Sequence, residues 1–317
     1  MKPIHIAVIL TCFNRREKTK ACLTSLFEAS KHYSAQLGVT LQLVVYLTDD
    51  GCTDGTSEAI QALCNAQHVE LHIVKGNGQW YWARGMRMSW LKALQEKERW
   101  QFYLLLNDDT LIYRQAFDEL FGAHQYALTE MGHAGIYAGI TCMPDNPNVI
   151  TYGGDVFATA AQGMSHRMAP SAHPQQVHVA NANILLIPTT VVAQIGIFPD
   201  CYVHSCADFD YCMRANRQGI PTLLTARVCG ECANDHESQE AECLRLINMS
   251  LRERKAYVCH PLHADAEYLT FVKRNMPRKY PISWLMRKMR LYTPQLYYYI
   301  NKLRGLYKET AQPNTTI

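Results

Sequence analysis

The chain has 317 residues, and 48% of them are apolar, which is enough for a continuous hydrophobic core and excludes disorder as the default state. Lys and Arg number 31 against 28 Asp and Glu, so the formal charge of +3 gives no general case for a nucleic-acid partner. Because the first residues run directly into the apolar segment Ile6–Leu10, without room for a secretory signal, we expect a cytoplasmic protein with reduced cysteines.

The first 110 residues alternate short apolar segments with longer segments of helical periodicity. This alternation predicts strands and helices in turn, at Ile6–Leu10, Arg16–Lys31, Leu41–Leu47, Ser57–Gln67, Val69–Val74, Arg84–Gln95 and Phe102–Leu106. Such an order is typical of an α/β protein, in which helices cover both faces of a parallel sheet. Ligands of these sheets bind beyond the carboxyl ends of the strands, so we expect the chemistry in the loops that follow them.

The rest of the chain gives a mixed pattern of strands and helices. We predict helices and strands at Gln115–Leu128, Ile184–Ile187, Asp208–Gln218, Thr222–Val228 and Gln239–Val258. Gly219 is placed to end the helix before it. No internal repeat divides this half of the chain.

Polar clusters follow three of the predicted strands. Thr11 and Asn14 follow the first strand, the segment Asp49–Thr56 ends the second, and Asn107-Asp108-Asp109 follows the fourth. Taken singly, their acidic residues could serve only in turns and helix caps. Carboxylates are also the ligands that Mg²⁺ and Mn²⁺ share with substrate phosphates. Three such clusters at one sheet edge favour a site for a phosphorylated ligand and a divalent cation.

In this order the clusters resemble the nucleotide-binding half of family 2 glycosyltransferases, including rhamnosyltransferase-like members that build bacterial polysaccharides. Asn107-Asp108-Asp109 is similar to a variant of that family's D-x-D metal motif. The segments Asn183–Ile187, Ile195–Phe198 and Asp208–Gly219 resemble the acceptor-side half. The resemblance extends over residues 4 to 240.

The resemblance implies the GT-A nucleotide-diphospho-sugar transferase fold, a mixed and mostly parallel sheet flanked by helices. It implies a domain of residues 1–260, with a nucleotide-sugar-binding half (1–110) and an acceptor-side half (111–260). Residues 261–317 would then form a helical basic and aromatic segment. The implied activity is inverting, metal-dependent transfer of a sugar from a UDP- or dTDP-sugar to a hydroxyl of a glycan or lipid-linked glycan.

The resemblance also assigns roles to single residues. By position, Thr11 and Asp50 would contact the nucleoside, Asp108 the ribose or the metal, and Asp109 the Mn²⁺ or Mg²⁺ cofactor. The remaining residues assigned to the nucleotide sugar are Asn14, Asn77, Arg84 and Gly85. Asn77 and Gly85 belong to a glycine-containing donor loop. Arg84 would meet a phosphate, and the alternative is a solvated cation at a helix start.

Asp208 occupies the position of the family's general base, at the start of a helix on the acceptor side. The family's usual Glu-Asp-x-Asp motif has Ala207 in place of the Glu, so the function of that Glu is in doubt here. Without the resemblance, Asp208 and Asp210 would be interpreted as a helix cap and a first-turn acid.

His236 resembles the family's histidine metal ligand, although a single histidine is also common as an ordinary core or surface residue. The nearby Cys229-Gly-Glu-Cys232, with Cys201, Cys206, Cys212 and His236, leaves a zinc site open as an alternative.

Two other functions stay open. A sugar nucleotidyltransferase would use a similar fold, but it usually has a glycine-rich basic loop after the first strand, and Thr11–Arg16 contains no glycine. Ala207 is compatible with a non-catalytic carbohydrate- or membrane-binding protein that keeps the transferase fold.

The segment from Tyr268 to Lys308 is both basic and aromatic. Between Phe271 and Lys308 it has ten Lys or Arg residues and no Asp or Glu, interleaved with Trp284 and several tyrosines. This composition is typical of helices that lie on anionic membrane surfaces, which predicts a peripheral position on the inner face of the cytoplasmic membrane. The alternative is that the aromatic residues pack on the transferase domain or across a homodimer interface.

Overall fold

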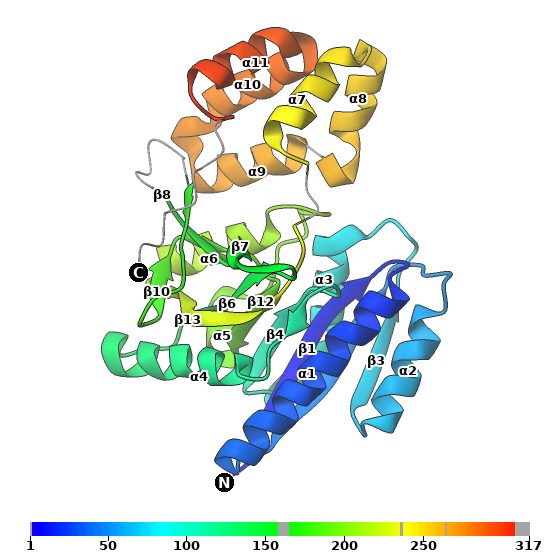
Figure 1. The fold of residues 1–317 in the computed structure, drawn as a ribbon, viewed down its shortest axis with the longest axis vertical. Coiled ribbons are helices and arrows are strands. Elements are labelled where there is room, and N and C mark those ends of the chain that lie inside the picture. The colour runs from blue at the N-terminus through cyan, green and yellow to red at the C-terminus, as the bar shows by residue number, and fades with distance from the viewer. Residues whose placement is uncertain (1, 158–164, 235–236, 264, 308–317) are drawn as a thin grey trace. The chain divides into compact units, whose positions relative to one another are not determined.

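The computed structural model describes residues 2–157, 165–234, 237–263 and 265–307. The chain divides into two compact units, Met1–Asn234 and Asp235–Ile317 (Figure 1). The sequence placed the boundary at residue 260, whereas the two units of the structure meet at residue 234. The boundary falls earlier because the helices on either side of residue 260 pack with the C-terminal helices.

A large mixed sheet forms the centre of the first unit, with strand order β10-β13-β6-β12-β4-β1-β2-β3. Its strands are β1 (Ile4–Cys12), β2 (Leu41–Asp49), β3 (Glu70–Lys75), β4 (Phe102–Leu106), β6 (Ile136–Met143), β10 (Gln175–Val177), β12 (Ile184–Pro188) and β13 (Thr222–Glu231). β5 (Leu111–Ile112) pairs with β13, and β7 (Asn146–Tyr152) pairs with β6. β1 lies between β2 and β4 and is parallel to both, and β12 is antiparallel to β4 and β6. This arrangement confirms the predicted α/β class.

A smaller sheet in the same unit has the strand order β11-β8-β9. Its strands are β8 (Gly154–Phe157), β9 (Ser165–Arg167) and β11 (Val179–Ala180). β11 leads through a short turn into β12, so this small sheet is continuous in sequence with a central strand of the large one.

Helices cover both faces of the large sheet (Figure 1). They are α1 (Arg16–Leu37), α2 (Thr56–Ala66), α3 (Tyr81–Ala93), α4 (Ala116–Tyr126), α5 (Thr189–Ile195) and α6 (Ala207–Arg217), with shorter helical segments at Leu94–Arg99 and Ala127–Met131. The side chains of β1 point alternately to the two faces of the sheet. Ile6 and Val8 are buried in the core cluster that includes residues of α1, α2 and α4. On the α3 side, Trp90 packs against Phe198 and Tyr211. Strands that are apolar on both faces therefore have the composition that this arrangement requires.

The second unit is helical. It consists of α7 (Gln239–Asn248), α8 (Leu251–Cys259), α9 (Asp265–Asn275), α10 (Tyr280–Tyr292) and α11 (Pro294–Leu303), with short helical turns at Pro261–His263 and Pro277–Lys279. The guanidinium of Arg290 is buried and forms ion pairs with Asp265 and Glu242, which joins three of these helices. None of the helices in the described part of the chain has the length and apolar composition needed to cross a bilayer.

The single helix predicted at Gln239–Val258 was wrong, because the chain forms two helices there. Ser250 starts α8 with a capping box, in which its hydroxyl accepts from the Glu253 N–H and the Glu253 carboxylate accepts from the Ser250 N–H. Such a box satisfies two backbone donors at a helix start, so it favours a new helix over continuation of the old one.

The packing of Trp90 gives a test of the core on the α3 side. Its side chain is fully buried, whereas the neighbouring Leu91 is 36% exposed. Trp90→Ala should lower the free energy of unfolding by about 3–5 kcal/mol, because it leaves a cavity among Tyr103, Phe198 and Tyr211. Leu91→Ala should lower it far less. Urea unfolding followed by circular dichroism measures both, and equal losses would contradict this packing.

Candidate active site

Asp49, the last residue of β2, holds the start of the following loop. Its buried carboxylate accepts hydrogen bonds from Lys75 Nζ at 2.7 Å, from the Cys52 N–H at 2.7 Å and from the Ser57 hydroxyl. Burial alone would raise the pKa of Asp49, but these donors outweigh burial and lower the pKa to about 2. Asp49 therefore stays ionised and is engaged within the protein.

Asp50 holds a second loop, the glycine-containing segment that was predicted to contact the donor. Its buried carboxylate accepts from the backbone N–H groups of Gly78, Trp80 and Tyr81, each at 2.9 Å. A side chain at Gly76 would collide with Asp50, because an added Cβ would lie 2.5 Å from Asp50 Oδ1. Three of the lone-pair positions of Asp50 are thus taken by backbone, a role that the sequence did not indicate.

Thr11, Asn14 and Gly85 lie where these loops meet. Gly85 contacts Thr11 so closely that an added Cβ would clash with the Thr11 hydroxyl, and its carbonyl accepts from Thr48 Oγ1 at 2.7 Å. Asn14 Oδ1 accepts from the Thr53 N–H at 2.8 Å, which joins the loops after β1 and β2. These contacts set the approach of α3 to the first two strands.

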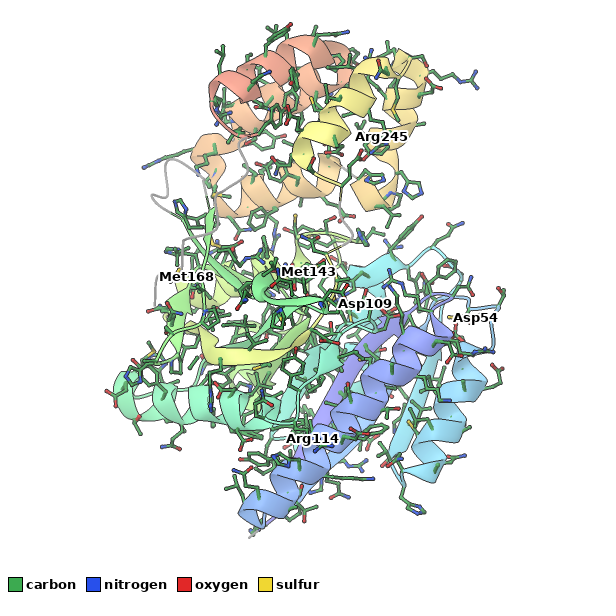
Figure 2. All side chains as sticks on the ribbon, in the orientation of Figure 1. Asp54, Asp109, Arg114, Met143, Met168 and Arg245 are labelled. Atoms are coloured by element: carbon green, nitrogen blue, oxygen red, sulfur yellow. The ribbon has the colours of Figure 1, made fainter. Side chains whose placement is uncertain are left out.

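Asp54 is a capping residue, as one interpretation of its segment allowed. Its carboxylate accepts from the N–H of Arg16, the first residue of α1, and from the N–H of Thr56, the first residue of α2. Two helix amino termini therefore meet at one carboxylate. Asp54 and Asp109 both lie at the carboxyl-end edge of the sheet (Figure 2).

Backbone strain is concentrated in the loops at this edge. Asn14, Tyr81 and Cys206 have positive φ angles of 51°, 54° and 65°. Non-glycine residues adopt this conformation at an energetic cost, which is typical of functional loops held by their surroundings. Tyr81 starts α3, and Cys206 directly precedes the helix that carries Asp208.

The turn after β4 places two carboxylates beside one guanidinium. Arg15 Nη1 lies 3.2 Å from Asp108 Oδ1 and 2.8 Å from Asp109 Oδ2. Thr19 donates a further hydrogen bond to Asp108 at 3.3 Å. The two carboxylates therefore converge on a single cationic atom, and Arg15, about half exposed, provides the positive charge.

Asp108 and Asp109 differ in their surroundings. Asp108 is 6% exposed, and burial is the main cause that raises its pKa to about 6; Arg15 opposes this rise and the neighbouring Asp109 adds to it. The Asp109 side chain is 23% exposed. Asp109 is thus the more accessible carboxylate of the pair.

Asp208 lies in the first turn of α6 and is 8% exposed. Its two carboxylate oxygens accept from the N–H of Ala182 at 3.2 Å and of Phe209 at 2.9 Å. Burial raises the pKa of Asp208 to about 6, against these two hydrogen bonds, which lower it. Asp210 lies two residues further along α6 and is fully buried. It forms an ion pair with Arg214 and a hydrogen bond with Tyr202, so its role is structural.

A short chain of contacts links Asp208 to Asp109. Ala182 donates to Asp208, and its neighbour Asn183 accepts at its carbonyl from the Asn107 N–H at 3.1 Å. The Asn183 amide contacts Cys232 Sγ at 3.5 Å, and the Cys232 thiol contacts Asp109 Oδ1 at 3.6 Å. The turn before β12 therefore fixes the acidic turn of β4 and the buried Asp208 in one site.

The residues of this site fit a divalent cation, because Asp108 and Asp109 turn oxygens toward a common positive charge and oxygen is the preferred ligand of Mg²⁺ and Mn²⁺. His236, the third ligand suggested by the sequence, lies outside the described residues. Cys229 and Cys232 contact protein groups instead of one another. Within the described residues no cysteine belongs to a group of converging metal ligands, so the zinc alternative has no support there.

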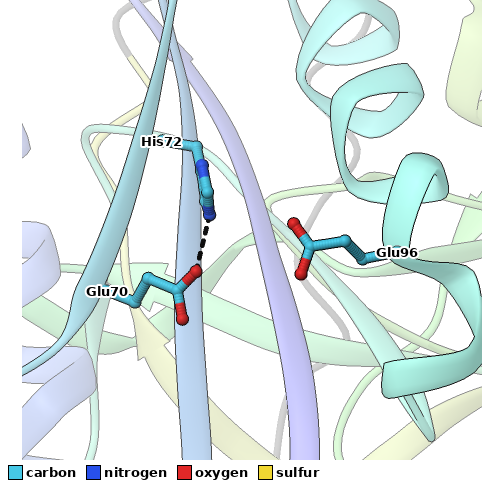
Figure 3. Close-up of side chains that lie close together, drawn as sticks. All are labelled: Glu70, His72 and Glu96. Carbon is cyan, nitrogen blue, oxygen red and sulfur yellow. Dashed lines mark hydrogen bonds and ion pairs between the residues drawn. The ribbon is translucent and has the colours of Figure 1, made fainter.

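A separate group of potential ligands lies between β3 and the helical segment Leu94–Arg99, away from the site. Glu70, His72 and Glu96 place their ligand atoms within 4.8 Å of one another, as Figure 3 shows. Arg99 donates to Glu70 at 2.6 Å and to Glu96 at 3.1 Å, so a guanidinium already balances both carboxylates. Glu70 begins β3, at the end of the strand opposite to the candidate active site.

No protein-family model matches the chain. A curated relative, the low-salt glycan biosynthesis hexosyltransferase Agl10 of Haloferax volcanii, is 23% identical over 173 residues, which are 53% of this chain and 52% of the relative. The chain thus matches about half the length of that protein.

Solved structures are similar over nearly the whole chain. The mannosyltransferase PcManGT of Pyrobaculum calidifontis, in complex with GDP-Man and Mn²⁺, has a TM-score of 0.50 and 11% identity, covering 98% of this chain and 77% of that one. Residues 1–349 of TarS from S. aureus, in complexes with UDP and with UDP-GlcNAc, give a TM-score of 0.51 and 12% identity, covering 96% and 93%. The fold is that of a glycosyltransferase. The fold class predicted from the resemblance is thereby confirmed.

In this glycosyltransferase fold, the described residues predicted for the site fall into two groups. Residues of the first group are engaged with other elements at the carboxyl-end edge: Thr11, Asn14, Asp50, Gly85, Asp108, Asp109 and Asp208. Asn77 and Arg84 form the second group, because their side chains are exposed on the donor loop and at the start of α3.

The sequence did not single out Arg15 or the Ala182–Asn183 turn. Arg15 directly follows Asn14 at the end of β1, and β1 pairs with β4, so strand adjacency was the signal that could have located it. The link through Ala182 is made by backbone, for which the residue type gives no signal.

The Asp50 contacts predict a measurable change in hydrogen exchange. Asp50→Ala should speed exchange of the Gly78, Trp80 and Tyr81 amides about 10- to 100-fold, because a hydrogen bond to a charged group contributes about 1.5–3 kcal/mol. Asn77→Ala is the matched control, since its side chain accepts from the Gln79 N–H of the same loop. Hydrogen–deuterium exchange with mass spectrometry measures both. Unchanged protection in Asp50→Ala would contradict the clamp.

Proposed function

We propose that the protein is an inverting, metal-dependent glycosyltransferase of polysaccharide biosynthesis. It transfers a sugar from a UDP- or dTDP-sugar to a hydroxyl of a glycan or lipid-linked glycan. The observation that carries the proposal is the link through Ala182 and Asn183, which joins the buried Asp208 to the Asp108–Asp109 turn. Similarity to a hexosyltransferase, to a mannosyltransferase solved with GDP-Man, and to TarS solved with UDP and with UDP-GlcNAc supports a nucleotide-sugar donor.

The nucleotide would lie on the loops after β1, β2 and β3. Phe13 is 52% exposed and borders the donor loop, where an added Cβ on Gly78 would lie 3.8 Å from its ring. An exposed aromatic ring at a binding edge offers a face on which a base can stack. Thr11 and Asp50 are the residues that would contact the nucleoside, and the exposed Arg84 would meet a phosphate.

Asp109 and Asp108 are the residues that would hold a divalent cation. A cation in that position supplies charge neutralisation for the diphosphate leaving group. Arg15 balances the two carboxylates and is placed to donate to a phosphate oxygen as the nucleotide binds.

Asp208 acts as the general base. Its carboxylate accepts the proton of the acceptor hydroxyl while that oxygen attacks the anomeric carbon on the side opposite the nucleotide, and this geometry inverts the configuration. A base works best when its pKa approaches the working pH, and burial raises the pKa of Asp208 to about 6. Ala207 adds no acid beside it, so Asp208 performs this step without a neighbouring carboxylate.

Removal of the metal tests the assignment of Asp109. We expect excess EDTA to abolish sugar transfer and Mn²⁺ to restore it, and Asp109→Ala to abolish transfer and weaken nucleotide-sugar binding while the protein stays folded. The same substitution at Asp118 on α4 should leave transfer unchanged. Release of nucleoside diphosphate measures activity, and release of pyrophosphate from a nucleoside triphosphate would instead indicate a nucleotidyltransferase. Full transfer in EDTA would sink the metal assignment and leave Arg15 as the source of positive charge.

Asp208→Asn keeps the size of the side chain and removes its basicity. Turnover should fall by about two to four orders of magnitude, because that is the usual contribution of a general base, while donor binding persists. The wild-type turnover should rise with pH through a pKa of about 6 and then level off, because the base must be ionised. A loss below tenfold, or a flat profile between pH 5 and 8, would reassign Asp208 to a helix cap.

A further inference from the structure

The second unit has an unusual exposed surface on α10 and α11. Large apolar side chains that are 45–88% exposed recur along these two helices, at Ile282, Trp284, Leu285, Tyr292, Leu296, Tyr299 and Leu303. Solvent-exposed apolar residues that are scattered singly are normal, but a concentration on adjoining helices marks an interaction surface. We call this set the α10–α11 face.

Helical spacing shows that these side chains form stripes. Ile282, Leu285 and Tyr292 are three and seven residues apart on α10, with the half-buried Met289 between them in the same row. On α11, Leu296, Tyr299 and Leu303 are three and four residues apart, on the side opposite to the buried Pro294 and Asn301. Residues spaced by three, four and seven share one side of a helix, so each helix has an inner side and an exposed apolar side.

Cations accompany the stripes. Lys288 is exposed with its Nζ 5.5 Å from the centre of the Trp284 ring, and Lys302 is exposed with its Nζ 5.5 Å from the Tyr298 ring. Arg278 and Arg304 are exposed as well. Cations that lie over aromatic rings keep their charge in water while their stems cover apolar surface.

Not every cation counted in the sequence contributes to this surface. Arg290 is 4% exposed and pairs with Asp265 and Glu242, and Arg287 pairs with Asp265. These two guanidinium groups hold the helices together. The charge available for a partner therefore comes from exposed residues such as Lys288 and Lys302, at the border of the apolar stripes.

We propose that the α10–α11 face docks on the surface of an anionic lipid bilayer. The exposed Leu and Ile side chains would enter the acyl boundary, Trp284 and the tyrosines would lie at headgroup level, and the lysines and arginines would meet anionic headgroups. This proposal does not depend on the glycosyltransferase activity, since the face lies entirely within the second unit.

A second copy of the chain fits this face less well than a bilayer does. Between residues 271 and 307 there is no Asp or Glu, so a symmetric dimer through this face would bring like charges together. The partner must combine negative charge with an apolar phase, and an anionic bilayer has both.

Vesicle sedimentation of the full chain tests the proposal. Binding should require phosphatidylglycerol in phosphatidylcholine vesicles and should fade at high salt, because the attraction is screened within a Debye length. Leu285→Ser with Leu296→Ser removes apolar contacts, and Lys288→Gln with Lys302→Gln removes charges; each lost charge should lower the partition constant about fivefold. The matched controls are Leu251→Ser and Lys255→Gln on α8, which are also exposed and should bind as the wild type does.

Four results would overturn the proposal. These are no sedimentation with anionic vesicles, equal binding to pure phosphatidylcholine, equal loss in the α8 controls, and unchanged binding in the α10–α11 variants. Light scattering identifies the alternative occupant: a dimer that dissociates in the Leu285→Ser, Leu296→Ser variant, without vesicle binding by the wild type, would make this face a subunit interface. Circular dichroism spectra matching the wild type confirm that each variant is folded.

Discussion

The buried carboxylates at the carboxyl-end edge of the sheet must be met by hydrogen-bond donors, and the loops of the site adopt the conformations that supply them. An unpaired buried charge would cost several kcal/mol, so each of these acids restrains whatever surrounds it. Asp50 takes three backbone donors from the loop before α3, and Asp208 takes one from the turn before β12. The positive φ angle of Tyr81 persists because its N–H is held by the Asp50 carboxylate.

Because different donors meet the buried carboxylates of Asp49 and Asp208, these two residues differ in pKa and in the role to which they are suited. Asp49 accepts a hydrogen bond from a lysine and stays strongly acidic, with a pKa of about 2. Asp208 accepts hydrogen bonds from backbone N–H groups alone, and burial raises its pKa to about 6. An acid of the first kind is suited to structure, and one of the second kind is suited to exchange a proton near neutral pH. The two roles follow from the surroundings of the residues, since both are aspartates at element ends.

The fold and the location of the site could be predicted from the sequence because both depend on local patterns. Apolar segments in β-α-β order indicated the sheet, and parallel strands carry their loops to one edge, so Asp50 and Asp108 could be placed there. The donors to Asp50 and Asp208 could not be predicted, because they come from loop backbone, and only the pairing of β1 with β4 points to Arg15 as a partner of Asp108 and Asp109. Arg15 and Asp109 are 94 positions apart. The break at Ser250 was different, since its Ser-x-x-Glu capping box is visible in the sequence.

The central claim is that the loops after β1, β2 and β3 bind a nucleotide sugar and that the turn after β4 holds a divalent cation. The most direct measurement is thermal unfolding of the whole protein with a panel of UDP-, dTDP- and GDP-sugars, with Mn²⁺ and with EDTA. A ligand that binds the native state raises its apparent stability. We expect a UDP- or dTDP-sugar to raise the Tm in Mn²⁺, and we expect this rise to disappear in Asp109→Ala. No stabilisation by any sugar of the panel, or an equal rise in Asp109→Ala, would contradict it.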